Sequence, residues 1–280
     1  MTYDNPIEFI KLLKSEHRAI ISTLCDIDAQ QGGASNIQDS ANKLNKITDL
    51  LFDHLEKEDK KLYPTLLASK HTTDMAKKYS YDMERLSCIA VDFYKRYCLN
   101  KEGLKIFVED FINGYSVFKG LLKVRIQREE TELYPAFILS QSGVLESEVI
   151  NYVKEKETNH QQNKRNIYVT GKNKQYLEAL VLGMEIAGFQ VSRIHSPNEI
   201  LLSAQKEENG LVLLDLTESD KETDELVMSL KRPGIQIVGY STTEPQKLKG
   251  IISSNLDAFV EKPAFNIEEF TKKMNQLVSK

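Results

Sequence analysis

The first 165 residues follow the apolar periodicity of amphipathic helices. Leu13, Ile20 and Leu24 recur at intervals of seven and four residues, so they share one helix face. The segment begins with Asn5-Pro6-Ile7-Glu8, which combines an N-cap, a proline at the first helical position and a capping-box glutamate. A helix is therefore predicted from this cap to the Gly32-Gly33 pair.

Four further helices are predicted in the same part of the chain. Only three prolines interrupt it, which leaves long stretches suited to helices. The expected helices span about 35–66, 73–99, 104–139 and 145–165. The last is strongly polar, with the run KEKETNHQQNKR, so we expect a partly exposed helix that links this part to the rest of the chain.

The pattern changes at Asn166, where short β-like runs begin to alternate with helix-capping signals such as Ser219-Asp220-Lys221-Glu222. The expected strands are Ile167–Thr170, Phe189–Ile194, Leu211–Leu216, Ile235–Tyr240 and Ala258–Glu261. Because five strands alternate with helices, the pattern predicts a doubly wound, flavodoxin-like α/β domain with a five-stranded parallel sheet.

The helical part contains an internal repeat. The segment His54–Pro64 (HLEKEDKKLYP) matches Arg125–Pro135 (RIQREETELYP) at a constant offset of 71 residues. A weaker echo pairs Glu16-His17 with Asp82-Met83. The simplest interpretation is an all-α four-helix bundle made of two related helix pairs.

The predicted organisation is therefore a two-domain chain. We assign residues 1–143 to the helical bundle, 144–165 to a linker helix and 166–280 to the α/β domain. The length of 280 residues fits two domains.

Composition and charge narrow the function classes only a little. The net charge of −4 and the pI near 5.9 give no reason to expect binding to nucleic acid or to an anionic membrane. The apolar runs are far shorter than a membrane span, and the N-terminal residues lack the pattern of a secretory signal. Three scattered cysteines fit a reducing compartment. We therefore expect a cytoplasmic protein.

The repeat also places candidate metal ligands. His54 and Glu58 are four residues apart, so they share one helix face. If each helix directs one such group to the bundle axis, His17, His54, Glu58 and Glu129 converge there with positions 83 and 125. An imidazole with carboxylates is a suitable ligand set for iron or manganese.

These residues make the first half resemble the hemerythrin-like, HHE cation-binding domain over about residues 5–140. The resemblance implies a di-iron centre that binds or senses O₂, NO or iron. It carries over to His17, His54, Glu58 and Glu129, and it would require histidines where this chain has Met83 and Arg125. Methionine is a weak ligand for iron, and arginine stays protonated and cannot bind a cation.

Two interpretations of this half stay open. We favour a metal-free bundle without cofactor, in which Arg125 pairs with Glu58 or Glu129 and supplies part of the positive charge of a metal. The alternative is one iron ion held by the remaining two histidines and carboxylates.

The second half resembles a response-regulator receiver domain. Asp215, Ser241 and Lys262 each stand at the end of a predicted strand, where doubly wound sheets place their sites. The resemblance implies a phospho-acceptor at Asp215, a hydroxyl that senses the phosphate at Ser241 and a lysine that pairs with it at Lys262. It also implies a signalling surface around Tyr240 and Pro263.

The receiver resemblance fails at the first strand. The family has an acidic pair there that holds Mg²⁺, whereas this chain reads Val169-Thr170-Gly171-Lys172. Without those carboxylates little fixes the metal that neutralises an incoming phosphoryl group. We therefore expect a pseudo-receiver in which phosphorylation is weak or absent.

The sequence predicts a non-enzymatic signalling or regulatory protein that acts through protein–protein contacts. The expected partner is a histidine kinase of a two-component system or another signalling protein, and a homodimer stays open. An iron-dependent sensor of O₂, NO or iron is a second possibility, and a phosphorylatable response regulator without a DNA-binding output is a third. An iron-dependent redox or repair enzyme is the least favoured.

Overall fold

The computed structural model describes residues 5–28, 37–96, 108–161, 166–171, 174–194, 199–200, 202–203, 210–217, 221–241, 255–261 and 267–278. The chain divides into two compact units, Met1–Asn159 and His160–Lys280. In the described residues, no helix is long and apolar enough to cross a membrane.

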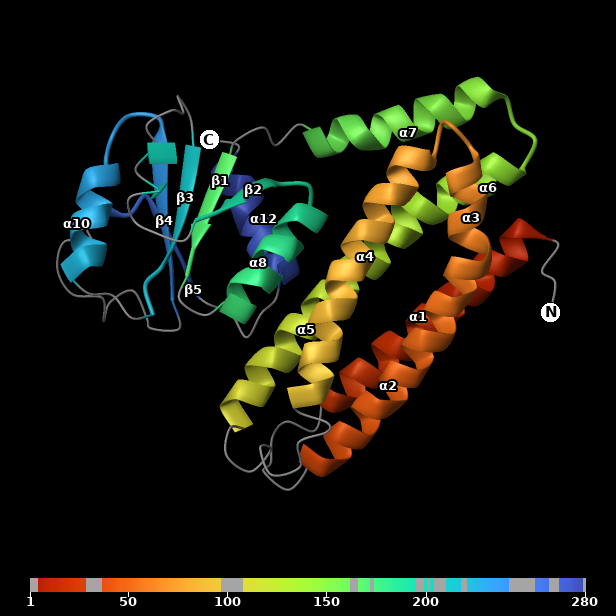
Figure 1. The fold of residues 1–280 in the computed structure, drawn as a ribbon, viewed down its shortest axis with the longest axis horizontal. Helices are drawn as coiled ribbons and strands as arrows, with labels where there is room; N and C mark the ends of the chain where they lie inside the picture. Colours follow the sequence, from red (N-terminus) through yellow and green to blue (C-terminus); the bar gives the residue numbers. More distant parts are fainter. Residues whose placement is uncertain are drawn as a thin grey trace. The chain divides into compact units, whose positions relative to one another are not determined.

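The first unit is a four-helix bundle (Figure 1). Its long helices are α1 (Pro6–Asp28), α2 (Ile37–Lys57), α4 (Thr73–Tyr94) and α5 (Val108–Arg128). Helix α1 packs chiefly on α2, and α4 packs on α5. The apolar faces that the periodicity predicted form the core, with Leu13, Ile20 and Leu24 completely buried. The predicted all-α bundle is thus confirmed.

Two of the predicted helices are interrupted by a π-helical turn. Helix α2 continues through η2 (Glu58–Leu62) into α3 (Tyr63–Ala68), and α5 continues through η5 (Glu129–Leu133) into α6 (Tyr134–Gln141). The Tyr63 N–H donates to the Glu58 carbonyl, five residues back, and Tyr134 donates to Glu129 in the same way. A proline follows each tyrosine and lacks an N–H of its own, so the wider turn loses no donor there.

The polar helix α7 (Glu146–Gln161) packs on the bundle. Val149 and Val153 are buried, and Val153 belongs to the same core cluster as Phe9 and Phe137. The Tyr152 hydroxyl donates to the Thr131 carbonyl at 2.9 Å. Most of the segment that we assigned to a linker therefore lies within the first compact unit.

The second unit is a five-stranded, all-parallel sheet with the order β2-β1-β3-β4-β5. Its elements are β1 (Asn166–Thr170), α8 (Lys174–Ile186), β2 (Gln190–Arg193), β3 (Gly210–Asp215), α10 (Lys221–Leu230), β4 (Ile235–Ser241), β5 (Ala258–Glu261) and α12 (Ile267–Val278). Helices α8 and α12 lie on one side of the sheet and α10 on the other (Figure 1). The strand order is that of flavodoxin-like folds, so the predicted fold class is confirmed.

The sheet buries its central strand, as the unbroken apolar run Leu211–Leu214 predicted. These four residues are at most 2% exposed. Asp215 follows them at the carboxyl end of β3, and Tyr240 lies opposite it in β4. The fold therefore places Asp215 at the edge of the sheet where doubly wound folds hold their ligands.

Candidate functional site

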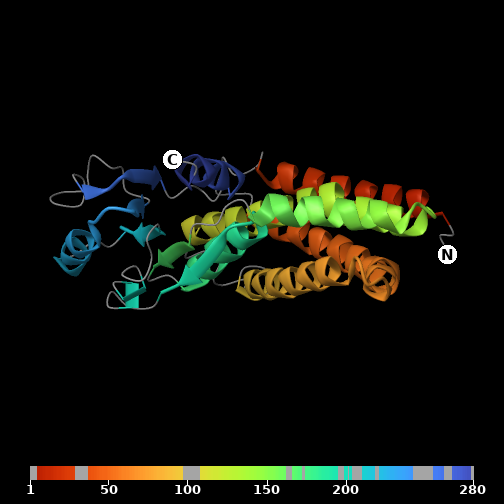
Figure 2. The same cartoon turned by 90° about the horizontal axis from the view of Figure 1, so that it is seen from above.

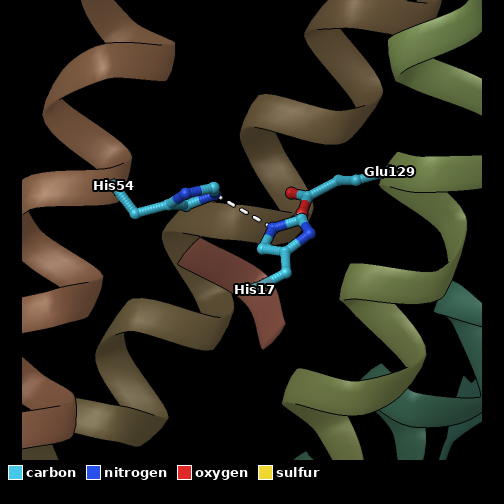
Figure 3. Close-up of side chains that lie close together, drawn as sticks. All are labelled: His17, His54 and Glu129. Atoms are coloured by element: carbon cyan, nitrogen blue, oxygen red, sulfur yellow. Dashed lines mark hydrogen bonds and ion pairs between the residues drawn. The ribbon is translucent and has the colours of Figure 1, made fainter. Parts of the chain in front are cut away.

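Three side chains from three helices meet in the centre of the bundle. His17 from α1, His54 from α2 and Glu129 at the start of η5 are all buried (Figure 3). The two Nε2 atoms of the histidines are 3.0 Å apart, and His17 Nε2 lies 3.3 Å from Glu129 Oε2. The structure thus brings together three of the four ligands that the sequence predicted.

Each histidine is held from its outer side by a carboxylate. Glu130 lies 2.9 Å from His17 Nδ1, and Glu16 lies 3.0 Å from His54 Nδ1. Because a carboxylate accepts the proton of Nδ1, both Nε2 atoms turn a lone pair toward the centre. Two lone pairs cannot bond to each other, so the short Nε2–Nε2 contact requires a proton or a metal ion between them.

The electrostatics favour the proton when no metal is bound. Burial lowers the pKa of His54, but the carboxylates of Glu16 and Glu58 outweigh it and raise this pKa to about 10. The His54 imidazolium then donates its Nε2 proton to His17. Burial raises the pKa of Glu129, but the charge of Arg125 outweighs it and lowers this pKa to about 2.

Arg125 enters the same cluster and is 1% exposed. Its Nε donates to Glu129 Oε1 at 2.6 Å, and its Nη2 donates to the Tyr63 hydroxyl at 2.7 Å. Its guanidinium carbon lies 4.5 Å from the centre of the Tyr79 ring. Arg125 therefore pairs with Glu129 rather than with Glu58, in a fully desolvated environment.

Glu58 lies beside the three-residue cluster and is completely buried. Its Oε1 is 3.6 Å from His54 Nε2 and accepts a hydrogen bond of 2.9 Å from the Tyr134 hydroxyl. The same hydroxyl lies 3.2 Å from His17 Nε2. Tyr134 thus connects the carboxylate that follows α2 to the histidine of α1.

The two tyrosines were not among the predicted site residues, although the repeat contains them. Tyr63 and Tyr134 are separated by the same 71 residues as His54 and Arg125. The π turns put each tyrosine five residues after a glutamate on the same helix face. The repeated Leu-Tyr-Pro was therefore the available signal, but its role depends on a turn that periodicity does not reveal.

Met83 occupies the position where the resemblance would require a histidine. It lines a hollow of about 10 Å³ together with His17, His54, Arg125 and Glu129. This volume is about that needed for a single water molecule.

The donor set fits one metal ion better than two. His17, His54 and Glu129 each offer an atom within 4.8 Å of the others. Two donors at about 2.1 Å from one ion and at right angles lie roughly 3.0 Å apart, which matches the contacts of His17. Two histidines and one carboxylate form the set typical of non-haem Fe(II), which leaves coordination positions open when bound. Arg125 supplies a fixed positive charge where a second ion would need a ligand.

In the second unit, Asp215 closes the turn that follows β3. Its Oδ1 accepts hydrogen bonds from the Thr217 N–H at 3.0 Å and from the Thr217 hydroxyl at 2.6 Å. A Cβ atom built on Gly171 would lie 3.3 Å from Asp215 Oδ2 and 2.8 Å from Tyr240 Oη. The edge of the sheet is thus closely packed around Gly171.

The resemblance implied a signalling surface around Tyr240 and Pro263. The Tyr240 side chain itself is 1% exposed. Its hydroxyl donates to the Thr170 carbonyl at 2.8 Å, and its ring stacks on Tyr176. Burial and the nearby Asp215 carboxylate raise the pKa of Tyr240 well above its usual value, so the phenol stays neutral. The register of β4 with β3 directs this side chain to the face of Asp215.

Of the other residues predicted at this edge of the sheet, the structure describes only Ser241. Ser241 is completely buried one position beyond Tyr240 in β4. Lys262 and Pro263 lie outside the described residues.

The first unit is therefore a four-helix bundle with a buried histidine–carboxylate centre, and the second is a doubly wound α/β domain. Residues 5–66 match the family described as Hemerythrin HHE cation binding domain. The chain thus contains a hemerythrin-like region, as the resemblance of its first half implied.

Solved structures similar to this chain include a response regulator from Thermotoga maritima, with 20% sequence identity and a TM-score of 0.36. The match covers 41% of this chain and 98% of the Thermotoga maritima chain. A CheY-like receiver domain from Methylobacillus flagellatus covers 41% of this chain and 98% of its own length, with 20% identity and a TM-score of 0.34. No curated protein matches the chain.

Proposed function

We propose that the chain is a non-enzymatic regulatory protein that acts through protein–protein contacts. In this proposal the helical unit is a metal-free relative of a cation-binding bundle, and the α/β unit does not accept a phosphoryl group. A cytoplasmic location belongs to the proposal and is supported by the scattered cysteines, of which Cys25 and Cys88 are free.

The observation that carries the metal-free state is the contact between Arg125 and Glu129. The guanidinium neutralises a carboxylate that a metal would otherwise need, at 2.6 Å and away from water. The imidazolium of His54 supplies a second positive charge between the two histidines. Buried charge is thus balanced by side chains alone.

Metal analysis of the purified protein tests this state. We expect less than one iron, manganese or zinc ion in ten chains after exposure to each ion and gel filtration. One iron ion per chain that is lost in His54→Ala would overturn the metal-free proposal. Asp53→Ala is the matched control, because Asp53 is an exposed residue of the same helix.

A second candidate is a sensor that holds one iron ion at His17, His54 and Glu129. It is supported by the three converging donor atoms and by the carboxylates that orient both imidazoles. A coloured protein whose spectrum responds to O₂ or NO would favour this candidate. The same spectrum would be expected of an iron-dependent redox or repair enzyme. Turnover of a substrate would distinguish that enzyme from a sensor.

The pseudo-receiver part is supported by the packing around Gly171. A carboxylate-bearing side chain at position 171 would collide with Tyr240 or Asp215, so the edge of the sheet lacks room for acidic Mg²⁺ ligands there. Incubation with acetyl phosphate and Mg²⁺ provides the test. We expect no stable labelling, and stoichiometric labelling that Asp215→Asn abolishes would establish a phosphorylatable regulator instead.

The partner is proposed to be another signalling protein, such as a histidine kinase, or a second copy of the chain. Size-exclusion chromatography with light scattering separates these two possibilities for the purified protein. A monomer at all accessible concentrations would remove the homodimer.

A further inference from the structure

A second hollow in the helical unit, separate from the histidine cluster, has no role in the function proposed above. It has a volume of about 360 Å³ and lies between α2 and α4 with α5 beneath. Helix α2 packs chiefly on α1, and α4 packs on α3 and α5, and the ribbons of α2 and α4 spread apart toward the start of α2 and the end of α4 (Figure 2). The hollow therefore lies between two helices that pack mainly on other partners.

The lining of this hollow is mostly apolar and partly buried. Leu44, Leu86, Phe93, Phe118 and Leu122 all line it, and each is at most 8% exposed. An occupant that contacts these five side chains would lie between the helices rather than on their outer faces.

The mouth of the hollow is also apolar. Phe52 is 63% exposed and Val91 is 40% exposed, and both belong to the lining. Leaving apolar surface of this kind in water is unfavourable by about 25 cal/mol per Å². Contact with an apolar molecule would remove part of this cost.

The polar groups of the lining define the charge of the occupant. Asp49 is the only carboxylate or basic side chain among the described residues that line the hollow. The Thr48 hydroxyl already donates to the Leu44 carbonyl at 3.0 Å. The described lining thus offers no cation to an acidic group, while the Asp49 carboxylate repels one.

We infer that this hollow is a binding site for a small, uncharged apolar molecule with an aromatic or aliphatic body. Apolar cavities of about 150 Å³ already hold benzene, so a volume of about 360 Å³ accepts a body of two or three rings. Drug-sized ligands occupy pockets of about 300–1,000 Å³ lined in the same way.

The site borders the histidine cluster through shared side chains. Leu51, Leu55, Met83 and Leu122 line both the large hollow and the small one beside His17 and His54. A molecule in the hollow would contact Met83, whose flexible side chain adapts to its surroundings. The methyl group of Met83 therefore reports on occupancy.

The test uses two probes that share one aromatic body and differ by a single anionic group. N-phenyl-1-naphthylamine is uncharged, and 1-anilinonaphthalene-8-sulfonate is the same body with a sulfonate. We expect saturable binding of one uncharged probe per chain, at least about tenfold tighter than the sulfonate, with a shift of the Met83 methyl resonance. That resonance is assigned by its loss in Met83→Leu.

Matched variants locate the binding. Ala90 lines the hollow, so Ala90→Phe should fill it and weaken the uncharged probe at least about tenfold. Ala68→Phe, at an exposed helical position outside the hollow, should leave the affinity within about twofold. If Ala90→Phe does not fold, Ser87→Leu at the same lining serves instead.

Three results would overturn the inference: no saturable binding, equal affinity for both probes, or an affinity that Ala90→Phe and Ser87→Leu leave unchanged. A dimer that loses the probe site as the chain concentration rises would show that a second copy fills the hollow instead.

Discussion

Arg125 and His54 hold equivalent positions in the two helix pairs, yet they bring different chemistry to one buried cluster. They are 71 residues apart in the repeat. His54 turns its Nε2 toward His17 at 3.0 Å, whereas Arg125 binds Glu129 at 2.6 Å. The helix pair that contains His54 thus supplies an imidazole that can gain or lose a proton. The pair that contains Arg125 supplies a permanent positive charge.

Replacing Arg125 should therefore destabilise the bundle. Arg125→Met leaves the Glu129 carboxylate buried without its partner, which costs about 3–5 kcal/mol. Chemical denaturation measures the change in the free energy of unfolding. Gln127→Met, on the exposed side of the same helix, should change it by less than about 0.5 kcal/mol. Equal stability of both variants would show that the buried pair contributes nothing.

Arg125→His should increase the amount of metal that the bundle binds. A histidine at this position supplies a neutral ligand and removes the competing charge beside Glu129. We expect this variant to bind more iron or zinc per chain than the wild type, measured by elemental analysis after loading and desalting. An unchanged metal content would mean that Arg125 does not limit metal binding.

The Tyr134 hydroxyl should contribute to stability in addition to its buried ring, which stacks on His17. Tyr134→Phe leaves Glu58 Oε1 without the hydrogen bond of 2.9 Å that it accepts. Loss of a hydrogen bond to a buried charged group costs about 1.5–3 kcal/mol. Tyr81→Phe is the matched control, because Tyr81 is 60% exposed. A similar small loss in both variants would contradict the role given to Tyr134.

The stability of chelator-treated protein should fall at both ends of the pH range. The pKa of His54 is raised from 6.5 to about 10 on folding, so its contribution is complete below pH 6.5 and is lost as pH rises toward 10. The pKa of Glu129 is lowered from 4.5 to about 2, so its contribution is complete above pH 4.5 and is lost as pH falls toward 2.

Denaturation at a series of pH values checks this prediction. His54→Gln should flatten the fall between pH 6.5 and 10, while the acid side keeps its slope. An alkaline fall that persists in this variant would assign it to different groups.

The contact between Gly171 and Tyr240 predicts a coupled pair of substitutions. Gly171→Ala adds a Cβ at 2.8 Å from Tyr240 Oη, and such overpacking costs about 1–3 kcal/mol. In a Tyr240→Phe background the colliding atom is absent, so the same change should cost less. A double-mutant cycle measures the difference. Additive effects would mean that the alanine strains something other than Tyr240.

The sequence predicted most of the fold because its signals are local. Alternating strands and caps identified all five strands to within one residue at each end, and the repeat identified the helix pairs. The same repeat placed His54 and Glu129 toward the axis. These inferences needed only periodicity and spacing.

The remaining features depend on contacts between distant segments. The carboxylates that hold the histidines come from Glu16 and Glu130, which lie on different helices from their partners. Tyr240 turns inward because β3 and β4 pair in a register that puts it opposite Asp215. Neither relationship follows from the order of residues within one element.

The two π turns let each of these helices hold one extra residue without disturbing the centre. Each turn holds one residue more than an α-helical turn would, between a glutamate and a tyrosine that both face the core. If such a turn closed to α-helical geometry with all its residues kept, the rest of the helix would rotate by about 100° and carry Tyr63 away from Arg125. Deleting one residue within the turn, such as Lys60, would instead convert it to α-helix and leave Glu58 and the tyrosine on the same face. At these two places the bundle should therefore tolerate a one-residue deletion that would shift the phase of an ordinary α-helix.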